Sequence, residues 1–178
     1  EGDIQGCFDN ISHRILLQKV WRMGIHDKRV LKIISQMLKA GYIERDLYRK
    51  TETGTPQGGI LSPLLSNIYL NDFDWYVGRT YMEPHRKCKH KCNDTRRLKW
   101  TGTTPKYNFR YADDWVVLTS TEKEAFRMKR ELTKYFRQKL KLELSQEKTY
   151  VTDLRTNGIH FLGFVVKACL LYTSDAAD

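Results

Sequence analysis

No apolar run in the 178-residue sequence approaches the roughly 18 to 20 residues that a helix needs to cross a bilayer. The first residues also lack the basic and apolar regions of a secretory signal peptide. Cysteine is scarce, and its four residues are scattered without the spacing of a disulfide framework, so we expect free thiols in a reducing compartment. These deficits predict a soluble, cytoplasmic protein with no membrane partner, and they exclude the membrane-spanning and disulfide-rich classes.

Acidic residues are the scarcer charge. The chain carries 31 Lys and Arg against 21 Asp and Glu, which gives a formal net charge of +10. Between Arg79 and Arg110 ten basic residues accompany two acidic ones, so this stretch alone has a net charge of +8. Such a block is typical of proteins that bind a polyanion, most commonly nucleic acid. With 40% hydrophobic and 29% charged residues, the whole composition indicates a globular domain and not a disordered or fibrous chain.

The order of the predicted elements indicates an α+β fold. Ser12 is a candidate N-cap for the first helix, and Thr121 with Glu124 forms a capping box at the start of the last one. The apolar stripe of that last helix consists of Phe126, Leu132, Phe136 and Leu140. We expect helices at about 12–24, 30–40, 60–76 and 121–140, a hairpin or loop at 42–55, an exposed basic insertion at 79–106, and strands at 107–111, 115–118, 150–153 and 159–166. This order predicts helices packed on one face of a small antiparallel sheet.

Three carboxylates stand where a strand and a turn would bring them together. Asp3 opens the chain, and Asp113 with Asp114 lies between two β-prone runs, as in a hairpin turn. If the strand that carries Asp3 lies beside that hairpin, Mg²⁺ would relieve the repulsion, because this cation binds a few carboxylates together with water and substrate phosphates. Two such ions roughly 3.5 to 4 Å apart are the usual arrangement for in-line nucleotidyl transfer. Taken alone, an Asp-Asp pair is more simply explained as solvated turn chemistry.

Four segments, in this order, favour the catalytic interpretation. They are residues 3–11 (DIQGCFDNI), 54–67 (GTPQGGILSPLLSN), 111–114 (YADD) and 144–149 (LSQEKT). In these segments the chain resembles the reverse transcriptases encoded by group II introns, which also act as maturases. A fifth segment, residues 161–164 (FLGF), is similar to the one with which such polymerases hold the primer end. The resemblance covers about residues 1 to 167.

The resemblance implies an RNA-directed DNA polymerase, a nucleotidyltransferase that copies intron RNA from a DNA or RNA primer with dNTPs as substrates. The implied cofactor is a pair of Mg²⁺ ions, for which Mn²⁺ can substitute. Asp3 and Asp113 match the metal-binding catalytic pair, and Asp114 is a third carboxylate nearby. Ile4 is a further residue expected at both the metal and the nucleotide.

Other matching positions imply roles around the substrates. Phe8 matches a position where an aromatic ring rejects the ribose 2′-OH by overlap, which favours DNA synthesis. Gln57 and Gly58 match the loop that lies against the incoming nucleotide and the template base, where glycine permits close backbone approach. Lys148 matches a lysine that protonates or neutralises the leaving pyrophosphate, although an exposed lysine at a helix end is the simpler alternative. The segment expected to hold the primer end comprises Phe161, Leu162 and Gly163.

The basic insertion at 79–106 has three interpretations. The first is contact with RNA phosphates, assisted by stacking on Trp100 or Tyr107. The residues for this contact are Arg86, Lys87, Lys89, Lys91, Arg96, Arg97 and Lys99. The second is zinc bound by two thiolates and two imidazoles, but the spacing is tighter than in known zinc fingers. The candidate zinc ligands are His85, Cys88, His90 and Cys92. The third is a solvated basic loop without a partner.

The resemblance also predicts the limits of the chain. Residues 1–167 match a partial palm of the right-hand polymerase architecture, truncated at both ends, without the fingers part before Asp3 and without the thumb. The tail 168–178 matches no family feature, and we expect it to be non-native. We therefore expect the isolated chain to be inactive. Alternatives for the parent protein are a non-catalytic RNA-binding maturase, which intact carboxylates disfavour, and a retron or diversity-generating reverse transcriptase. The host would be bacterial or archaeal, or the location an organelle.

Overall fold

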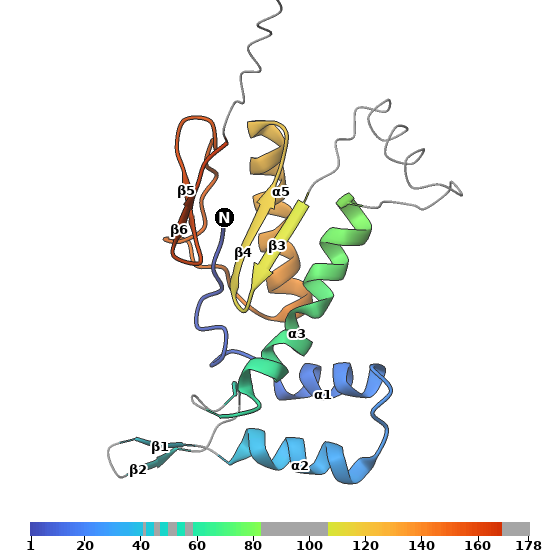
Figure 1. Cartoon of the computed structure of the whole chain (residues 1–178). Coiled ribbons are helices and arrows are strands. Elements are labelled where there is room, and N and C mark those ends of the chain that lie inside the picture. The colour runs from blue at the N-terminus through green and yellow to red at the C-terminus, as the bar shows by residue number, and fades with distance from the viewer. Residues whose placement is uncertain (41, 45–46, 50–52, 56–58, 83–106, 169–178) are drawn as a thin grey trace, which may run out of the picture.

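The computed structural model describes residues 1–40, 42–44, 47–49, 53–55, 59–82 and 107–168 (Figure 1). The helices are α1 (His13–Arg22), α2 (Lys28–Lys39), α3 (Ser62–Val77) and α5 (Glu122–Tyr135), and the π-helical turns η1 (Gly78–Met82) and η2 (Phe136–Leu140) extend α3 and α5. The strands are β1 (Tyr42–Glu44), β2 (Leu47–Arg49), β3 (Tyr107–Tyr111), β4 (Asp114–Leu118), β5 (Ile159–Phe161) and β6 (Phe164–Val166). Among these residues no helix is both long enough and apolar enough to span a membrane.

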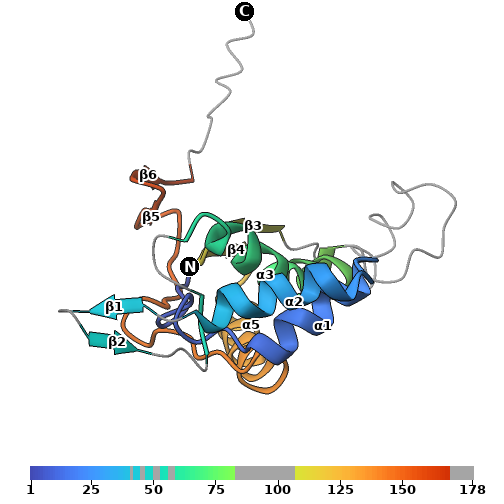
Figure 2. The ribbon, with the colours of Figure 1, turned by 90° about the horizontal axis from the view of Figure 1, so that it is seen from below.

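Helices are combined with small antiparallel sheets, as predicted. The strands form three two-stranded sheets, β1–β2, β3–β4 and β5–β6. In the central hairpin Tyr107 pairs with Leu118 and Tyr111 with Asp114, so the two residues 112–113 form its turn. Helices α1 and α2 lie side by side at one end of the molecule, away from the β5–β6 hairpin (Figures 1 and 2).

The N-terminal segment extends the β3–β4 hairpin into a wider sheet. Gly2 forms an antiparallel bridge with Trp115 of β4, and Ile4 forms another with Leu144. The first residues of the chain therefore lie between β4 and the stretch 143–145, which places a segment from the start of the sequence in the middle of this sheet.

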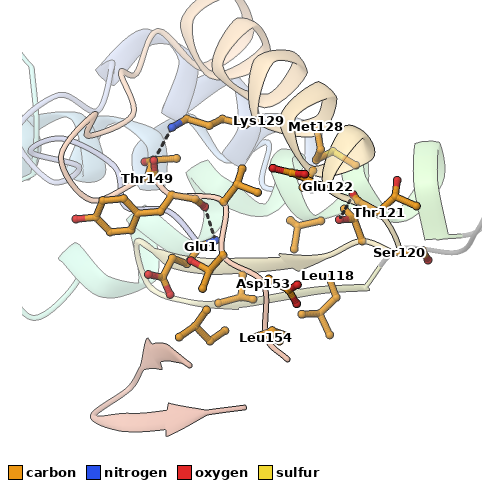
Figure 3. Close-up of a pocket in the computed structure, with 18 of the residues that line it drawn as sticks. Glu1, Leu118, Ser120, Thr121, Glu122, Met128, Lys129, Thr149, Asp153 and Leu154 are labelled. Carbon is orange, nitrogen blue, oxygen red and sulfur yellow. Dashed lines mark hydrogen bonds between the residues drawn. The ribbon is translucent and has the colours of Figure 1, made fainter. Parts of the chain in front are cut away.

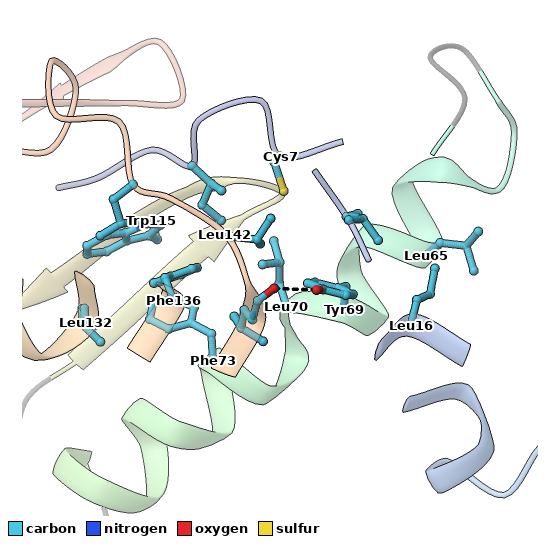
Figure 4. Close-up of a cluster of buried hydrophobic side chains, with 14 of the residues drawn as sticks. Cys7, Leu16, Leu65, Tyr69, Leu70, Phe73, Trp115, Leu132, Phe136 and Leu142 are labelled. Carbon is cyan, nitrogen blue, oxygen red and sulfur yellow. Dashed lines mark hydrogen bonds between the residues drawn. The ribbon is translucent and has the colours of Figure 1, made fainter. Parts of the chain in front are cut away.

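Helix α3 and the turn η2 pack on one face of this hairpin. The Trp115 ring lies 5.6 Å from the Phe73 ring of α3 and 6.3 Å from the Phe136 ring of η2, measured between centroids. The Tyr69 hydroxyl donates a hydrogen bond to the Leu140 carbonyl at 2.5 Å, which joins α3 to η2 (Figure 4). Because Tyr69, Phe73 and Phe136 are fully buried, α3 is a rigid support behind the sheet.

The start of α5 follows the predicted capping box, but one residue of its apolar stripe does not. The Thr121 hydroxyl accepts a hydrogen bond from the Glu124 N–H at 3.3 Å, and the Glu124 carboxylate accepts one from Ser120 at 3.4 Å. The prediction that Phe126 faces the core is wrong, since its side chain is exposed. At about 100° per residue, Phe126 lies nearly opposite the buried Met128 on this helix.

Ser12 is the N-cap residue of α1, as predicted, although its side chain makes no capping hydrogen bond. One further local prediction is wrong. The stretch 150–153 is not a strand; its backbone exchanges hydrogen bonds with Glu1 through Tyr150 alone, at 3.0 and 3.1 Å. β-prone residues form a strand only where a neighbouring strand pairs with them, and here the pairing stops after one residue.

Candidate active site

Asp3 is held between two extended neighbours. Gly2 exchanges both backbone hydrogen bonds with Trp115, at 2.9 and 3.1 Å, and the Asp3 carbonyl accepts one from the Ser145 N–H at 2.9 Å. Continuing the Gly2–Trp115 register by one residue sets Asp3 opposite Asp114. Because side chains alternate along a strand and Trp115 faces the helices, Asp3 and Asp114 lie on the other face of the sheet.

Glycine at position 2 is required by the same contact. A Cβ atom there would lie 2.3 Å from Cζ2 of Trp115, well inside van der Waals contact. The indole ring therefore occupies the space that any other side chain would fill. The close approach of the N-terminal segment to β4, which brings Asp3 to the hairpin, depends on this glycine.

The β3–β4 turn carries Asp113, is followed directly by Asp114, and contains one residue in a backbone conformation that is uncommon outside glycine. Ala112 has a φ of 53°, in the left-handed region that usually favours glycine. Its carbonyl accepts a hydrogen bond from Nη1 of Arg110 at 2.7 Å. Asp113 is half-buried, whereas Asp114 is exposed. In the sequence, Arg110 counts only as one basic residue of the cluster 79–110. Its position directly before the turn is the signal that could have indicated a role at the carboxylates.

Lys148 joins the carboxylates from a third segment. Its Nζ atom lies 3.2 Å from Oδ2 of Asp3, whose side chain is 16% exposed. The hydrogen bond and the charge of Asp3 raise the pKa of Lys148, and Asp114 and Asp113 add to this effect. Loss of hydration, then the charges of Asp113 and Asp3, raise the pKa of Asp114, while Lys148 opposes the rise. The structure thus brings together Asp3, Asp113, Asp114 and Lys148, the four residues that the resemblance implied to be catalytic.

A buried cysteine that the sequence did not single out lies near this group. Cys7 is 2% exposed and is a free thiol. Burial, followed by the charges of Asp113 and other groups, raises the pKa of Cys7 to about 12. The thiol therefore stays neutral and serves as packing near the carboxylates.

The donor set suits a hard divalent cation, although within the described residues no three His, Cys, Asp or Glu side chains form a metal site by themselves. Carboxylate oxygens are the donors that such a cation prefers, and their charges repel one another without it. The Ile4 side chain is buried and has no donor atom, so only the main-chain carbonyl of Ile4 can contribute a ligand to the metal. The hydrogen bonds of the adjacent bridge use the Asp3 carbonyl and the Gln5 N–H, so the Ile4 carbonyl points to the other side, towards the hairpin.

Phe8 lies beside the start of the segment 54–67. The Phe8 carbonyl accepts a hydrogen bond from the Thr55 N–H at 2.7 Å, and the Ile11 carbonyl accepts one from Gly54 at the same distance. Gly54 has a φ of +89°, and a Cβ atom there would lie 2.7 Å from the Asp9 carbonyl oxygen. This close backbone contact joins two segments that the resemblance assigns to the incoming nucleotide.

Several predicted residues lie outside the described residues. Gln57 and Gly58 are two of them. The predicted RNA contacts are others: Arg86, Lys87, Lys89, Lys91, Arg96, Arg97 and Lys99. The same holds for Trp100 and for the alternative zinc ligands His85, Cys88, His90 and Cys92. Tyr107, the other predicted stacking residue, is exposed at the start of β3.

The predicted primer-holding segment forms the turn of the β5–β6 hairpin. Phe161 pairs with Phe164, and the two residues between them have positive φ, 53° at Leu162 and 80° at Gly163. This conformation is that of a tight two-residue hairpin turn. Leu162 and Phe164 are exposed, so the hairpin presents apolar side chains to its surroundings.

A pocket of about 620 Å³ lies elsewhere, between β4, the start of α5 and residues 149–155 (Figure 3). Met128, Leu118 and Leu154 are among its lining residues, together with Glu1. None of the predicted site residues lines it. The carboxylates therefore lie on an open face of the sheet and not in this pocket.

Comparison with known proteins shows which family the chain is similar to. Residues 1–166 match the reverse transcriptase (RNA-dependent DNA polymerase) family. The group II intron-encoded protein LtrA of Lactococcus lactis subsp. cremoris is 35% identical over 208 residues, covering 94% of this chain and 34% of that protein. Protein YkfC of Escherichia coli (strain K12) is 35% identical over 173 residues, covering 92% of this chain and 45% of that protein. A 91 kDa protein in the cob intron of Schizosaccharomyces pombe is 28% identical and covers 92% of this chain.

The chain spans less than half the length of these relatives. The family match nevertheless extends over nearly the whole sequence, and it includes the N-terminal segment, the β3–β4 turn and the stretch 144–148 that meet at the carboxylates. The chain therefore belongs to the reverse transcriptase (RNA-dependent DNA polymerase) family and is related to proteins encoded by group II introns.

Proposed function

We propose that the parent protein is the RNA-directed DNA polymerase of a mobile group II intron, which also assists intron splicing. The observation that carries this proposal is the meeting of Asp3, Asp113, Asp114 and Lys148 from three separate segments. A protein that used this fold only as a scaffold would not need three carboxylates in electrostatic contact, because the single ammonium group of Lys148 leaves most of their mutual repulsion in place. Membership of the reverse transcriptase family supports the same reaction class.

Asp3 and Asp113 would hold the metal, with Asp114 beside them and the Ile4 carbonyl on the same side. Two Mg²⁺ ions, for which Mn²⁺ can substitute, would supply activation of a primer 3′-OH and neutralisation of charge on the leaving pyrophosphate of the dNTP. The protein contributes fixed positions: the paired backbone around Gly2 and Trp115 sets Asp3 against Asp114 before any substrate arrives.

Other residues would act on the substrates. Lys148 would neutralise or protonate the pyrophosphate, and its bond to Asp3 places its ammonium group at the carboxylates. Phe8 would exclude a ribose 2′-OH. Gln57 and Gly58 would bind the same nucleotide, as the resemblance implies. The turn formed by Phe161, Leu162 and Gly163 would hold the primer end.

Residues 1–167 would form the palm of a right-hand polymerase, with 168–178 beyond it. The basic insertion at 79–106 would bind phosphates of the intron RNA template, with a DNA or RNA primer as the second strand. A palm by itself would bind RNA weakly and would not polymerise, because it would not hold primer, template and nucleotide in line. The parent would act in the cytoplasm of a bacterial or archaeal host, or in an organelle.

Primer extension by the full-length parent tests the proposal. On an RNA template with Mg²⁺, Asp113→Asn should lower DNA synthesis by about 10²- to 10³-fold or more, since it removes an electrostatic group at the reacting phosphate. Binding of intron RNA should remain. The matched control is Asp153→Asn, which changes an exposed carboxylate that is paired with Arg155 and lies outside the site.

Three outcomes separate the alternatives. Synthesis by the wild-type parent that is lost in Asp113→Asn and kept in Asp153→Asn supports the polymerase. RNA binding and splicing assistance without any synthesis would identify a non-catalytic maturase. Normal synthesis by Asp113→Asn would remove Asp113 from the metal site.

The role of the basic insertion is tested through salt. Replacing Arg86, Lys87, Lys89 and Lys91 with Gln should flatten the log–log dependence of RNA binding on salt by about 0.7 for each phosphate of a single strand that is no longer neutralised. An unchanged slope would place the RNA-binding surface elsewhere on the protein.

A further inference from the structure

Arg110 joins helix α3 to the turn that carries the carboxylates. Its Nη1 donates to the Ala112 carbonyl at 2.7 Å and to Oδ1 of Asn67 at 2.9 Å. Its Nε and Nη2 bind the Asp74 carboxylate at 2.9 and 2.6 Å. The Arg110 side chain is only 10% exposed, whereas Asp74 is 34% exposed and the bond to Asn67 lies at the surface. One guanidinium thus connects α3 to the turn that carries Asp113.

We propose that Arg110 is a positioning residue for the catalytic carboxylates: Asp74 and Asn67 orient its guanidinium, which holds the Ala112 carbonyl and thereby sets the place of Asp113. This inference rests on the proposed polymerase function. It adds a residue whose role the sequence did not indicate, because Arg110 would touch neither metal nor nucleotide.

The turn needs such a restraint for two reasons. Ala112 has a φ of 53°, a conformation that L-residues other than glycine rarely adopt and that persists where surrounding contacts enforce it. In addition, the turn brings Asp113 and Asp114 towards Asp3, and like charges push it away. The pairing of Trp115 with Gly2 restrains the turn from the β4 side. The bond from Arg110 restrains it from the β3 side.

Helix α3 provides the fixed end of this restraint. Asn67 and Asp74 are seven residues apart, two helical turns, and therefore share one face of α3. Asp74 also accepts a hydrogen bond from Asn108 at 3.3 Å, so two alternate residues of β3 bind the same carboxylate. Tyr69 and Phe73 anchor this part of α3 in the core. Lysine cannot reproduce the arrangement, because its ammonium is a point charge without the planar fork.

The competing explanation is that the Arg110–Asp74 pair only ties α3 to β3. Backbone amide hydrogen exchange in the full-length parent, measured on a peptide that covers 111–114, distinguishes this explanation from positioning of the turn. The measurement reports on the turn without requiring activity. The variants are Arg110→Lys, which keeps the charge, and Asp74→Asn, which keeps Arg110 but removes the anion that orients it. Arg155→Lys is the matched control, since Arg155 also binds an aspartate, Asp153, at 2.9 Å.

In both variants we expect faster exchange at 111–114, with unchanged exchange in α1 and in β5–β6. In primer extension kcat should fall about 10- to 100-fold, the cost of displacing a reacting group by about 1 Å, with the KM for dNTP within about twofold. Unchanged exchange at the turn, or exchange that rises equally everywhere, would overturn the inference. So would a normal kcat beside a loosened turn. A wild-type parent without any extension would instead refute the proposed function, and the exchange result would still decide the role of Arg110.

Discussion

The β3–β4 and β5–β6 hairpins close in a similar way but depend on different parts of the chain. Each has a two-residue turn whose first residue, Ala112 or Leu162, has a φ of 53°. The first turn is bonded to Arg110, and the strand that follows it pairs with Gly2 and packs on the core through Trp115. In the second hairpin every residue of β6 is exposed.

The difference teaches where each geometry comes from. In the second turn a glycine, Gly163, takes one of the two positive φ angles, so local sequence is enough. The first turn contains no glycine, and remote residues enforce its shape. The position of the carboxylates is therefore a tertiary property, whereas the shape of the β5–β6 turn is a local one. Substitutions near the β3–β4 turn should therefore lower the rate of primer extension, whereas substitutions in the β5–β6 turn should lower only the local stability of that hairpin.

The largest effect is expected at Lys148. In the full-length parent Lys148→Met should slow extension by about 10²- to 10⁴-fold, the range for loss of a group that transfers a proton in the transition state. Lys123→Met, at another exposed lysine, is the control. Lys148→Arg sharpens the result, because arginine keeps the charge but does not give up a proton. Recovery of activity in Lys148→Arg would assign Lys148 to charge neutralisation alone.

The next effect concerns the choice of sugar at Phe8. Phe8→Val should raise the use of ribonucleotides relative to deoxynucleotides by about 10- to 200-fold, since one group of this size in a packed site contributes roughly 1 to 3 kcal/mol of discrimination. The ratio of kcat/KM for the two substrates measures it. Phe126→Val, at an exposed ring on α5, should leave the ratio unchanged. An unchanged ratio in Phe8→Val would mean that the ring only packs against its neighbours.

The sequence predicts the local elements better than the contacts between them. The two β-prone runs 107–111 and 115–118 were sufficient to predict the β3–β4 hairpin, and Thr121 with Glu124 to predict the start of α5. The meeting of Asp3 with Asp114 was reached through the family resemblance, because no periodicity encodes a bridge between Gly2 and Trp115. Arg110 was missed since a basic residue inside a basic cluster gives no sign of a half-buried carboxylate partner such as Asp74.

A smaller effect is expected where the N-terminal segment meets β4. Gly2→Ala would place a Cβ atom 2.3 Å from the Trp115 ring, which Phe73 and Phe136 hold in place. Overpacking of this kind costs about 1 to 3 kcal/mol of unfolding free energy. Thermal unfolding of the parent measures it. Gly78→Ala is the control, because a Cβ there meets no atom within 4 Å and helical backbone tolerates alanine. Equal unfolding temperatures in the two variants would mean that the Gly2 contact is not tight.

The smallest effect compares the two turns directly through opposite substitutions. Gly163→Ala places a Cβ in open space at a φ of +80°, so only backbone strain of about 1 to 2 kcal/mol acts, and it should appear as faster amide exchange confined to β5–β6. Ala112→Gly relieves similar strain but gives the unfolded chain about 0.4 to 1 kcal/mol more conformational entropy, so the entropy offsets part of the relieved strain. Exchange at 111–114 should then stay close to that of the wild type, because Arg110 and the Gly2 pairing still hold the turn. Exchange at 111–114 that rises as much as in β5–β6 would show that the first turn, too, is governed by its own residues.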